Sequence, residues 1–307
     1  MENDKRLLHQ LEELESMERH DADALVAGLA ENQNKIKKDA QLYYDERKDH
    51  AWIKDYYRGI HFTHSSPIQL GRDLQELIRT THRITHPYYV SKDQYLYTWV
   101  DLQPDGQLKS IYSGIQKNPK QVIEEEFETI RKRFERYRDL LLNPQVTSQE
   151  FDQEVQSIAS QHKFNAEHIV PQSWFRAKEP MKGDLHHLFA CEPKCNRIRA
   201  NFPYYEFNAI ADSTRFRNDC GIYETNRFEP EYGKGTAARA TLYFILRYPE
   251  EINEDFRREI NIPLMIRWHA QFPATDYEKH RNQAIYEIQG NRNPFIDFPD
   301  LVNKVAL

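Results

Sequence analysis

The stretch that decides the fold is KFNAEHIVPQSWFRAKEPMKGDLHHLFACEPKCNRIRANFPYY, residues 163–205. It holds an adjacent carboxylate and imidazole, Glu167 and His168. An Asp-x-His-His run follows at residues 184–187, and an asparagine- and arginine-rich run at residues 195–201. No other part of the sequence gathers as many groups that can bind a metal ion or transfer a proton. We therefore expect the chemistry of this chain to be centred here.

The same stretch predicts two short strands followed by a helix. Residues 165–170 suit a strand that Pro171 ends, residues 185–189 suit a second strand, and Pro193 can start a helix. Neighbouring side chains on a regular strand point to opposite faces of the sheet. Glu167 and His168 can therefore share one site only if the strand ends or bulges at this point, which the following proline favours.

This arrangement suits the hydrolysis of a phosphodiester bond, in which a water loses a proton and charge grows on phosphorus and on the leaving oxygen. His168 can accept the proton because imidazole titrates near neutral pH. A hard cation such as Mg²⁺ can stabilise the charge, and Glu167 and Asn196 offer oxygen ligands of the kind it prefers. Arg199 or Arg197 could contact a non-bridging phosphate oxygen.

Composition indicates a globular protein that carries a local positive charge. The 307 residues are 39% hydrophobic and 29% charged, which is too apolar for a disordered chain. The net charge of -6 argues mildly against a nucleic-acid partner, because phosphate binders are usually basic. Residues 163–203, however, hold seven basic and four acidic side chains. A basic island in an acidic protein is what a polyanion site would look like.

The N-terminus and the cysteines bear on cellular location. The first twenty residues are charged throughout and lack the apolar core of a signal peptide, so we expect a cytoplasmic protein, with a removed leader or non-classical secretion as the alternative. No apolar run is long enough for a membrane span. Three cysteines, Cys191, Cys195 and Cys220, do not suggest a disulfide framework. Buried free thiols are the favoured interpretation, with a disulfide link or a structural Zn²⁺ site left open.

Helices predominate in the rest of the chain. Residues 1–58 are helical in character and predict an extension that packs on the main domain or on a partner. The aromatic and β-branched residues 95–102, the turn 104–106 and residues 108–112 predict a β-hairpin. Proline, capping and apolar-spacing patterns predict helices that start at Pro67, cover residues 118–142, 148–161 and 235–248, and run from a Thr275/Glu278 capping box to Gly290.

These features resemble the bacterial endonuclease I family, whose members are ββα-metal (His-Me finger) nucleases. The similarity covers residues 60–300 with gaps, and its pieces stand in the family's order: EHIVPQSWF (167–175), GDLHHL (183–188), CNRIRANFPY (195–204), GKGTAARATLYFILRY (233–248) and YEKHRNQAIYEIQGNRNPFID (277–297). The resemblance implies an α+β fold. A small antiparallel sheet in the ββα core (163–205) is surrounded by helices, within a domain at 59–307 that carries a helical insertion at 117–162.

The resemblance also implies roles for single residues. His168 corresponds to the general base, Glu167 and Asn196 to ligands of one Mg²⁺, Mn²⁺ or Ca²⁺ ion, and Asp184 and His186 to a motif that braces the site. Some members carry an arginine that stabilises the transition state, and none aligns cleanly here because residues 175–184 are few. Arg176, Lys182 or Arg199 could take that role, and Arg199 is our first candidate. The candidates for substrate contact are Arg176, Lys182, Arg197 and Arg239, of which Arg239 could equally form a structural salt bridge.

The sequence therefore predicts a metal-dependent endonuclease that cleaves DNA, and RNA as well, with little sequence specificity. One alternative is a nuclease restricted to RNA or to structured or single-stranded nucleic acid. A second is a non-catalytic, zinc-holding interaction module. The expected partners are nucleic acids, without a membrane, and an inhibitor protein is one means by which a cytoplasmic host could survive such an enzyme.

Overall fold

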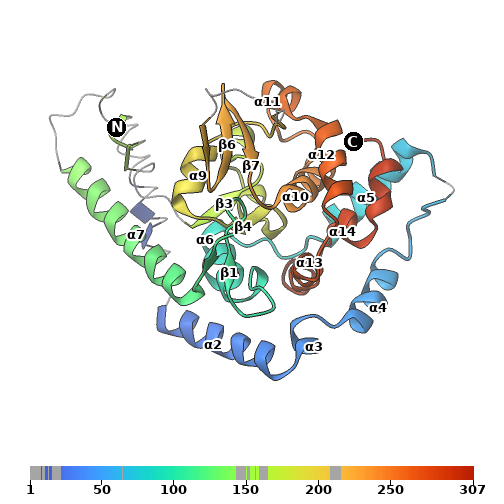
Figure 1. Ribbon diagram of the computed structural model, residues 1–307, viewed down its shortest axis with the longest axis horizontal. Helices are drawn as coiled ribbons and strands as arrows, with labels where there is room; N and C mark the ends of the chain where they lie inside the picture. Colours follow the sequence, from blue (N-terminus) through green and yellow to red (C-terminus); the bar gives the residue numbers. More distant parts are fainter. Residues whose placement is uncertain are drawn as a thin grey trace.

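The computed structural model describes residues 22–63, 65–142, 165–207 and 216–307, together with scattered positions at 8, 11–12, 14–15, 150, 153–155 and 157–158. Within these residues the protein is mostly helical, and its strands form three small antiparallel sheets (Figure 1). The predicted α+β class is confirmed. The predicted helix at 148–161 and most of the stripe expected before residue 20 lie outside the described residues.

The predicted strand–strand–helix core lies in the middle of Figure 1. Strand β3 (Ala166–His168) pairs antiparallel with β4 (Leu188–Ala190), so that Glu167 lies opposite Phe189. Helix α9 (Pro193–Arg199) follows and packs on β3. The second strand begins three residues later than predicted. Residues Leu185–His187 instead form a 3-10 turn, η4, because the Asp184 carboxylate caps it by accepting a hydrogen bond from the His186 amide.

A layer of helices backs this core. Helix α10 (Lys234–Arg247) is buried over almost its whole length, as predicted, and packs on α12 (Ile262–Gln271) and α5 (Pro67–Thr81). The close approach of α10 needs Gly235, because a Cβ atom there would stand 2.3 Å from the Phe272 carbonyl oxygen. The shorter elements of this layer are α11 (Glu254–Glu259), α14 (Pro294–Asp297) and η5 (Pro299–Asn303).

Helix α13 (Asp276–Gln289) also belongs to this layer, and it ends at Gly290 as predicted. The predicted capping box is wrong, because the Thr275 side chain makes no capping hydrogen bond. The Glu278 carboxylate turns instead to the guanidinium of Arg239, at 2.6 and 2.7 Å. A buried arginine thus outcompetes the helix N-terminus for this carboxylate, and the pair ties α13 to α10.

The predicted hairpin at 95–112 is wrong in its first strand. Residues Ser91–Val100 form a π-helical segment, η1, which follows the single turn α6 (Tyr88–Val90). The strands that do pair are β1 (Leu108–Lys109) and β2 (Gln116–Lys117). Aromatic and β-branched residues favour strands when one face is exposed. Here Leu96, Tyr97 and Val100 are completely buried among α2, α7, α13 and β4, so tertiary packing overrides local preference.

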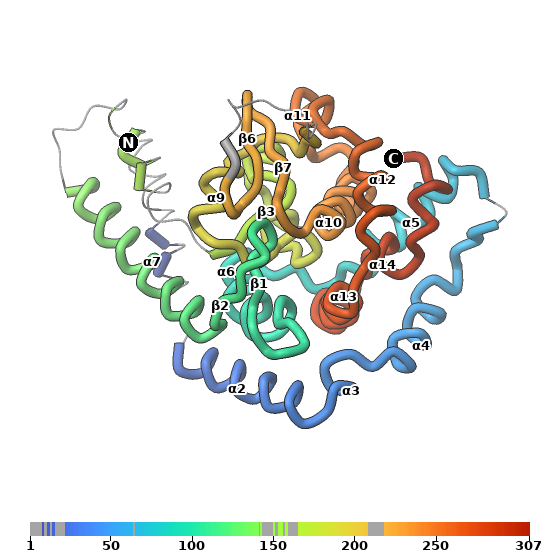
Figure 2. Tube along the Cα trace, viewed as in Figure 1, coloured from blue at the N-terminus to red at the C-terminus, as the bar shows by residue number. Residues whose placement is uncertain are grey.

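The N-terminal helices wrap one side of the molecule (Figure 2). They are α2 (Ala22–Lys38), α3 (Ala40–Tyr43) and α4 (Glu46–Tyr56), and α2 packs on η1 and on the long helix α7 (Pro119–Leu141). Helix α7 starts at its Asn118 cap, as predicted. The division into an extension at 1–58 and a domain at 59–307 stays a prediction.

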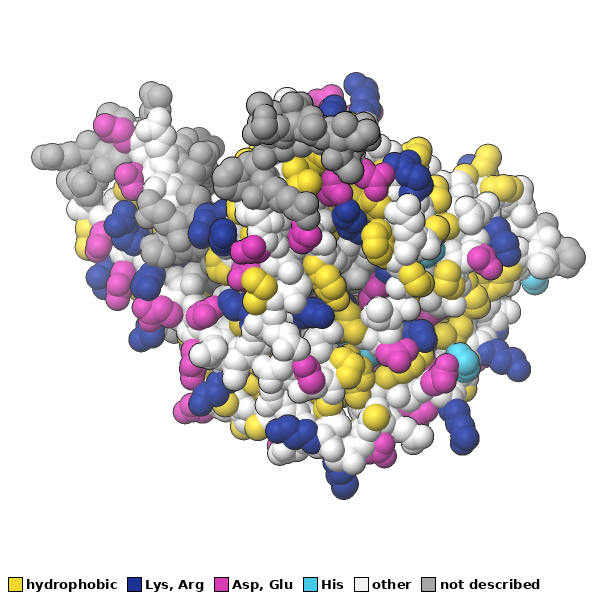
Figure 3. All heavy atoms as spheres, in the orientation of Figure 1, with side chains coloured by type: hydrophobic (Ala, Val, Ile, Leu, Met, Phe, Trp, Pro, Cys, Tyr) yellow, Lys and Arg dark blue, Asp and Glu magenta, His cyan; other side chains and the backbone are white. Residues whose placement is uncertain are grey.

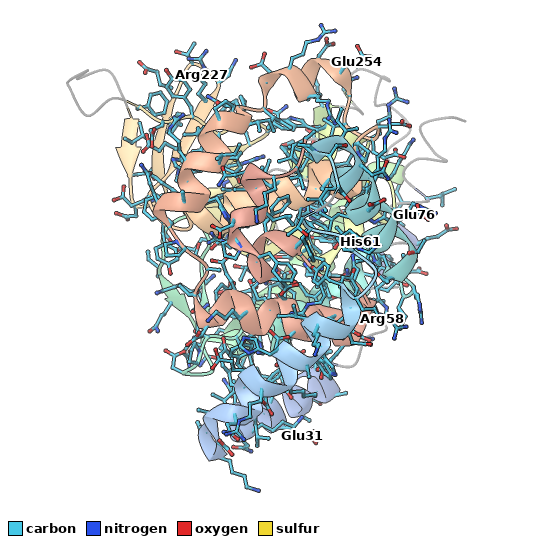
Figure 4. The ribbon with its side chains drawn as sticks, turned by 90° about the vertical axis from the view of Figure 1, so that its right-hand side faces the viewer. Glu31, Arg58, His61, Glu76, Arg227 and Glu254 are labelled. Atoms are coloured by element: carbon cyan, nitrogen blue, oxygen red, sulfur yellow. A yellow bond between two sulfur atoms is a disulfide. The ribbon has the colours of Figure 1, made fainter. Side chains whose placement is uncertain are left out.

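A three-stranded sheet, β5 (Phe216–Asn218), β6 (Gly221–Glu224) and β7 (Arg227–Pro230), stands at the opposite end of the molecule from α2 (Figure 4). The disulfide Cys195–Cys220 joins α9 to the turn between β5 and β6, with its Cα atoms 5.2 Å apart. The prediction of free thiols is therefore wrong for these two residues, because folding brings together cysteines that are 25 positions apart. Cys191 is buried and lies outside the disulfide.

Candidate active site

The His168 ring is held at both of its nitrogens. Its Nε2 donates a hydrogen bond to the Lys182 carbonyl oxygen at 2.8 Å, and its Nδ1 lies 3.1 Å from the Gln172 amide nitrogen. A carbonyl oxygen can only accept, so the ring proton is on Nε2 and the lone pair is on Nδ1. The ring is 5% exposed and lies against Tyr88 and His187. The structure thus presents His168 as a neutral base whose Nδ1 can receive a proton.

The Lys182 carbonyl is fixed by a tight loop. The two carboxylate oxygens of Glu179 accept hydrogen bonds from the amides of Tyr88, at 3.0 Å, and Gly183, at 2.8 Å. Only glycine fits at position 183, because a Cβ atom would stand 2.0 Å from the His86 carbonyl oxygen. The contact between this loop and the segment before α6 therefore sets where the His168 ring points.

Glu167 contacts a different set of residues from its neighbour. Its Oε1 accepts a hydrogen bond from the Tyr112 hydroxyl at 2.8 Å and lies 3.4 Å from the Arg199 Nε, and the side chain is 3% exposed. Tyr112 is in turn hydrogen-bonded to the Tyr204 hydroxyl at 2.8 Å. Burial and the neighbouring carboxylate raise the pKa of Tyr112 well above its usual range, so it remains a donor. Glu167 is accordingly a buried carboxylate held between a hydroxyl and a guanidinium group.

Arg199 is part of this pocket and not a mobile cation. Its Nη2 donates to the Ile169 carbonyl at 2.7 Å and its Nη1 to the Ala200 carbonyl at 3.2 Å, and the side chain is 1% exposed. Burial lowers the pKa of Arg199, but Tyr112, Tyr204 and Glu167 outweigh it and raise the pKa above the ordinary value. The geometry favours Arg199 as the residue that holds Glu167 in place.

Asn196 lies one turn before Arg199 on α9 and faces the same strand. Its amide nitrogen donates to the Ala166 carbonyl at 2.7 Å, so the amide oxygen is the end that suits a cation. Glu167 on β3 and Asn196 on the helix that packs on it both carry side-chain oxygen atoms, the donor type that Mg²⁺ prefers. No cluster of three or more His, Cys, Asp or Glu side chains suited to a metal is found among the described residues. A cation bound by Glu167 and Asn196 would take its remaining ligands from water and from phosphate oxygens.

Asp184 is buried where η4, α10 and α13 meet. Its carboxylate accepts hydrogen bonds from the hydroxyls of Tyr243 and Tyr248 and from the Gln289 amide, at 2.8–3.1 Å. Burial raises its pKa, but nearby histidines and the Gln289 hydrogen bond lower it below the usual range overall. Burial also lowers the pKa of His186 to about 4, so this ring is neutral. Both residues are positioned to brace the segment that leads into β4.

The remaining predicted contact residues separate into two classes. Arg239 is 1% exposed and paired with Glu278, so its predicted phosphate contact is wrong and the structural salt bridge is what forms. Arg176 and Arg197 are exposed, and the Lys182 ammonium lies over the Tyr88 ring. Sequence reasoning missed Gln172, Tyr112, Tyr204 and Glu179. Gln172 and Tyr204 lie inside motifs quoted from the sequence, and Glu179 lies between them, whereas Tyr112 lies outside that stretch.

Comparison with known proteins settles the family. The family described as endonuclease I matches residues 68–300. This chain belongs to the endonuclease I family. An extracellular deoxyribonuclease of Aeromonas hydrophila is 32% identical over 119 residues, 38% of this chain and 50% of that protein. An extracellular ribonuclease of Bacillus subtilis is 29% identical over 159 residues, 46% and 54% of the two chains. The chain spans about half the length of the curated relatives it matches.

Family membership confirms the predicted resemblance, whereas the predicted cytoplasmic location is wrong. The Aeromonas hydrophila relatives include a periplasmic as well as an extracellular deoxyribonuclease, and the Bacillus relatives are extracellular. The Cys195–Cys220 disulfide agrees with this correction, because disulfides persist in oxidising surroundings. Among the described helices, none has the length and apolar character needed to cross a membrane.

Proposed function

We propose that this endonuclease I family member is a metal-dependent endonuclease that hydrolyses phosphodiester bonds outside the cytoplasm. The single observation that carries the proposal is the orientation of His168. Its Nε2 is committed to the Lys182 carbonyl, so Nδ1 can act as the base. Glu167 precedes His168 on the same strand, and Asn196 lies on helix α9, which packs on that strand. A base beside an oxygen-ligand pair is the minimum that phosphodiester hydrolysis needs.

In this proposal each side chain has one task. His168 takes a proton from the attacking water at Nδ1, and the Lys182 carbonyl steadies the imidazolium that results. A divalent cation held by Glu167 and Asn196 would supply positive charge to the phosphate and the leaving oxygen. Arg199 and Tyr112 hold the Glu167 carboxylate, which otherwise would be free to rotate. The positively charged side chain that contacts the phosphate is then Arg176, Lys182 or Arg197, each of which is more exposed than Arg199.

The proposed substrates are DNA and RNA. Relatives of similar identity are named deoxyribonucleases and ribonucleases, and the ribonucleases align with a longer part of this chain. An enzyme that contacts mainly phosphates reads little sequence. An assay with supercoiled plasmid, single-stranded DNA and RNA, each with Mg²⁺ and with EDTA, separates general cleavage from cleavage restricted to one substrate.

The decisive experiment is His168→Ala. General-base catalysis typically contributes at least about 100-fold, so we expect plasmid nicking in Mg²⁺ to fall by that factor or more. His61→Ala is the matched control, because this exposed histidine lies on the surface between α4 and α5 (Figure 4). Parental nicking by the His168 variant would remove the proposed base and with it the mechanism.

A further inference from the structure

We infer that Gln172 is a positioning residue for the general base: its side-chain amide holds the Nδ1 lone pair of His168 in the direction from which water is deprotonated. The inference rests on the proposed function, because it matters only if His168 is the base. It goes further by giving a role to a residue that the motif alone leaves without one.

The geometry defines which end of the amide faces the ring. Gln172 Nε2 lies 3.1 Å from His168 Nδ1, while His168 Nε2 is 2.8 Å from the Lys182 carbonyl. Since Nε2 carries the proton, Nδ1 can only accept, and the amide must present its N–H. The ring is thus clamped between one acceptor and one donor. Rotation of the ring by 180° would set carbon atoms against both partners.

The backbone explains why Gln172 can reach the ring. Strand β3 ends at His168, and after Pro171 residues Gln172–Phe175 form the 3-10 turn η2, in which Trp174 and Phe175 are buried. These two anchors fix the turn against the core. Gln172 stands at the start of the turn, four residues after His168, and is half-buried, whereas the His168 ring is 5% exposed. The amide is therefore the more accessible partner of the pair.

This geometry assigns Gln172 a task before catalysis begins. Before substrate arrives, its N–H occupies the position that a water O–H takes during catalysis. A water that displaces the amide meets a lone pair already aligned, because the Lys182 carbonyl still holds the other nitrogen. If the base is incorrectly oriented, kcat falls while the affinity for substrate is unchanged.

Three variants test the assignment. Gln172→Leu removes the donor and keeps the bulk, and we expect kcat on plasmid DNA to fall about fivefold, the worth of one hydrogen bond of roughly 1 kcal/mol, with KM unchanged. Gln172→Glu keeps the shape but presents only acceptors to Nδ1, and should fall at least as far. Ser173→Asp is the matched control, because it adds the same charge on the exposed neighbour in the same turn.

A second readout avoids turnover altogether. In the metal-free protein, ¹⁵N spectra of the histidine rings report which nitrogen is protonated, and the His168→Ala variant identifies the signal. We expect a single Nε2–H form in the parent and in Ser173→Asp, and averaged or Nδ1–H signals in Gln172→Leu and Gln172→Glu. Unchanged kcat together with an unchanged spectrum in both Gln172 variants overturns the inference. An active His168→Ala variant would instead overturn the proposed function.

Discussion

At the scale of single residues, the site depends on buried ions that are paired within the protein. Arg199 provides one test. Replacing it with methionine would remove the guanidinium beside the buried Glu167 carboxylate, and breaking a buried pair typically costs about 3–5 kcal/mol. We expect Arg199→Met to lower the free energy of unfolding in urea by that order.

Arg197 offers the matched control for this change. It is exposed on the same short helix, so Arg197→Met should change stability by no more than about 0.5 kcal/mol. Equal stability of the two variants would show that the guanidinium of Arg199 is not needed to hold the carboxylate.

The histidines around Asp184 predict loss of stability in acid. Burial lowers the pKa of His186 to about 4 and also lowers the pKa of His82 and His187. A histidine whose folded-state pKa lies below its unfolded-state value contributes fully above about pH 6.5, and the contribution is lost as pH falls toward the folded-state value. We expect the free energy of unfolding to decrease from pH 7 to pH 4, by about 3 kcal/mol for His186 alone.

Urea denaturation at several pH values measures this slope. The lowered pKa of Asp184 acts in the same direction, since its stabilising charge is lost as pH falls through its own folded-state value. His186→Gln should flatten the curve between pH 6.5 and pH 4. A parent protein whose stability stays constant over that interval would contradict the neutral, buried assignment of these rings.

At the scale of elements, helix α9 is secured from two directions. It packs on β3 through Asn196 and Arg199, and it is tied to the three-stranded sheet by Cys195. A disulfide that closes a loop of this size stabilises by about 3 kcal/mol. We expect the Cys195→Ser, Cys220→Ser double variant, or reduction of the parent, to lower the free energy of unfolding by that amount.

Reductant titrations check this prediction. Cys191→Ala retains the disulfide and should still lose stability on reduction, whereas the double variant should no longer respond. If the double variant were as stable as the oxidised parent, the bond would add nothing to the native state.

Elements were predictable from sequence where local signals agree with packing. Prolines at 67, 119 and 193 start α5, α7 and α9 as expected, whereas the first strand ends at His168, before Pro171. The segment 91–100 was not predictable, since Leu96, Tyr97 and Val100 are buried by packing against distant elements while the segment is helical. In the site, residue types predicted Glu167, His168 and Asn196. The role of Gln172 was hidden, because the ring tautomer depends on a carbonyl fourteen residues away.

At the scale of the molecule, charge is mixed and not gathered into one field. Figure 3 shows basic and acidic side chains interspersed over one face, in keeping with the net charge of -6. Nucleic-acid binding must then depend on a few local cations near the site. We expect the affinity for DNA, measured in EDTA so that no cleavage occurs, to fall with salt at a slope set by those contacts.

A single substitution tests this expectation. Arg197→Gln should weaken DNA binding and reduce the salt slope by about 1, as expected for one lost phosphate contact. Lys37→Gln, an exposed change on α2 at the end of the molecule farthest from the β5–β7 sheet, should leave both unchanged. Fluorescence polarisation over a salt series distinguishes the two, and identical slopes would place the binding surface elsewhere.

Helix α9 spans only Pro193–Arg199, yet two of its buried side chains, Asn196 and Arg199, contact strand β3. One added residue between them would rotate the second by about 100°, away from the carboxylate it holds. An insertion or deletion between these two residues of the helix would therefore break one of the contacts, whereas surface loops tolerate changes in length. A designer who wishes to graft a new segment onto this enzyme should treat positions 193–199 as a fixed spacer.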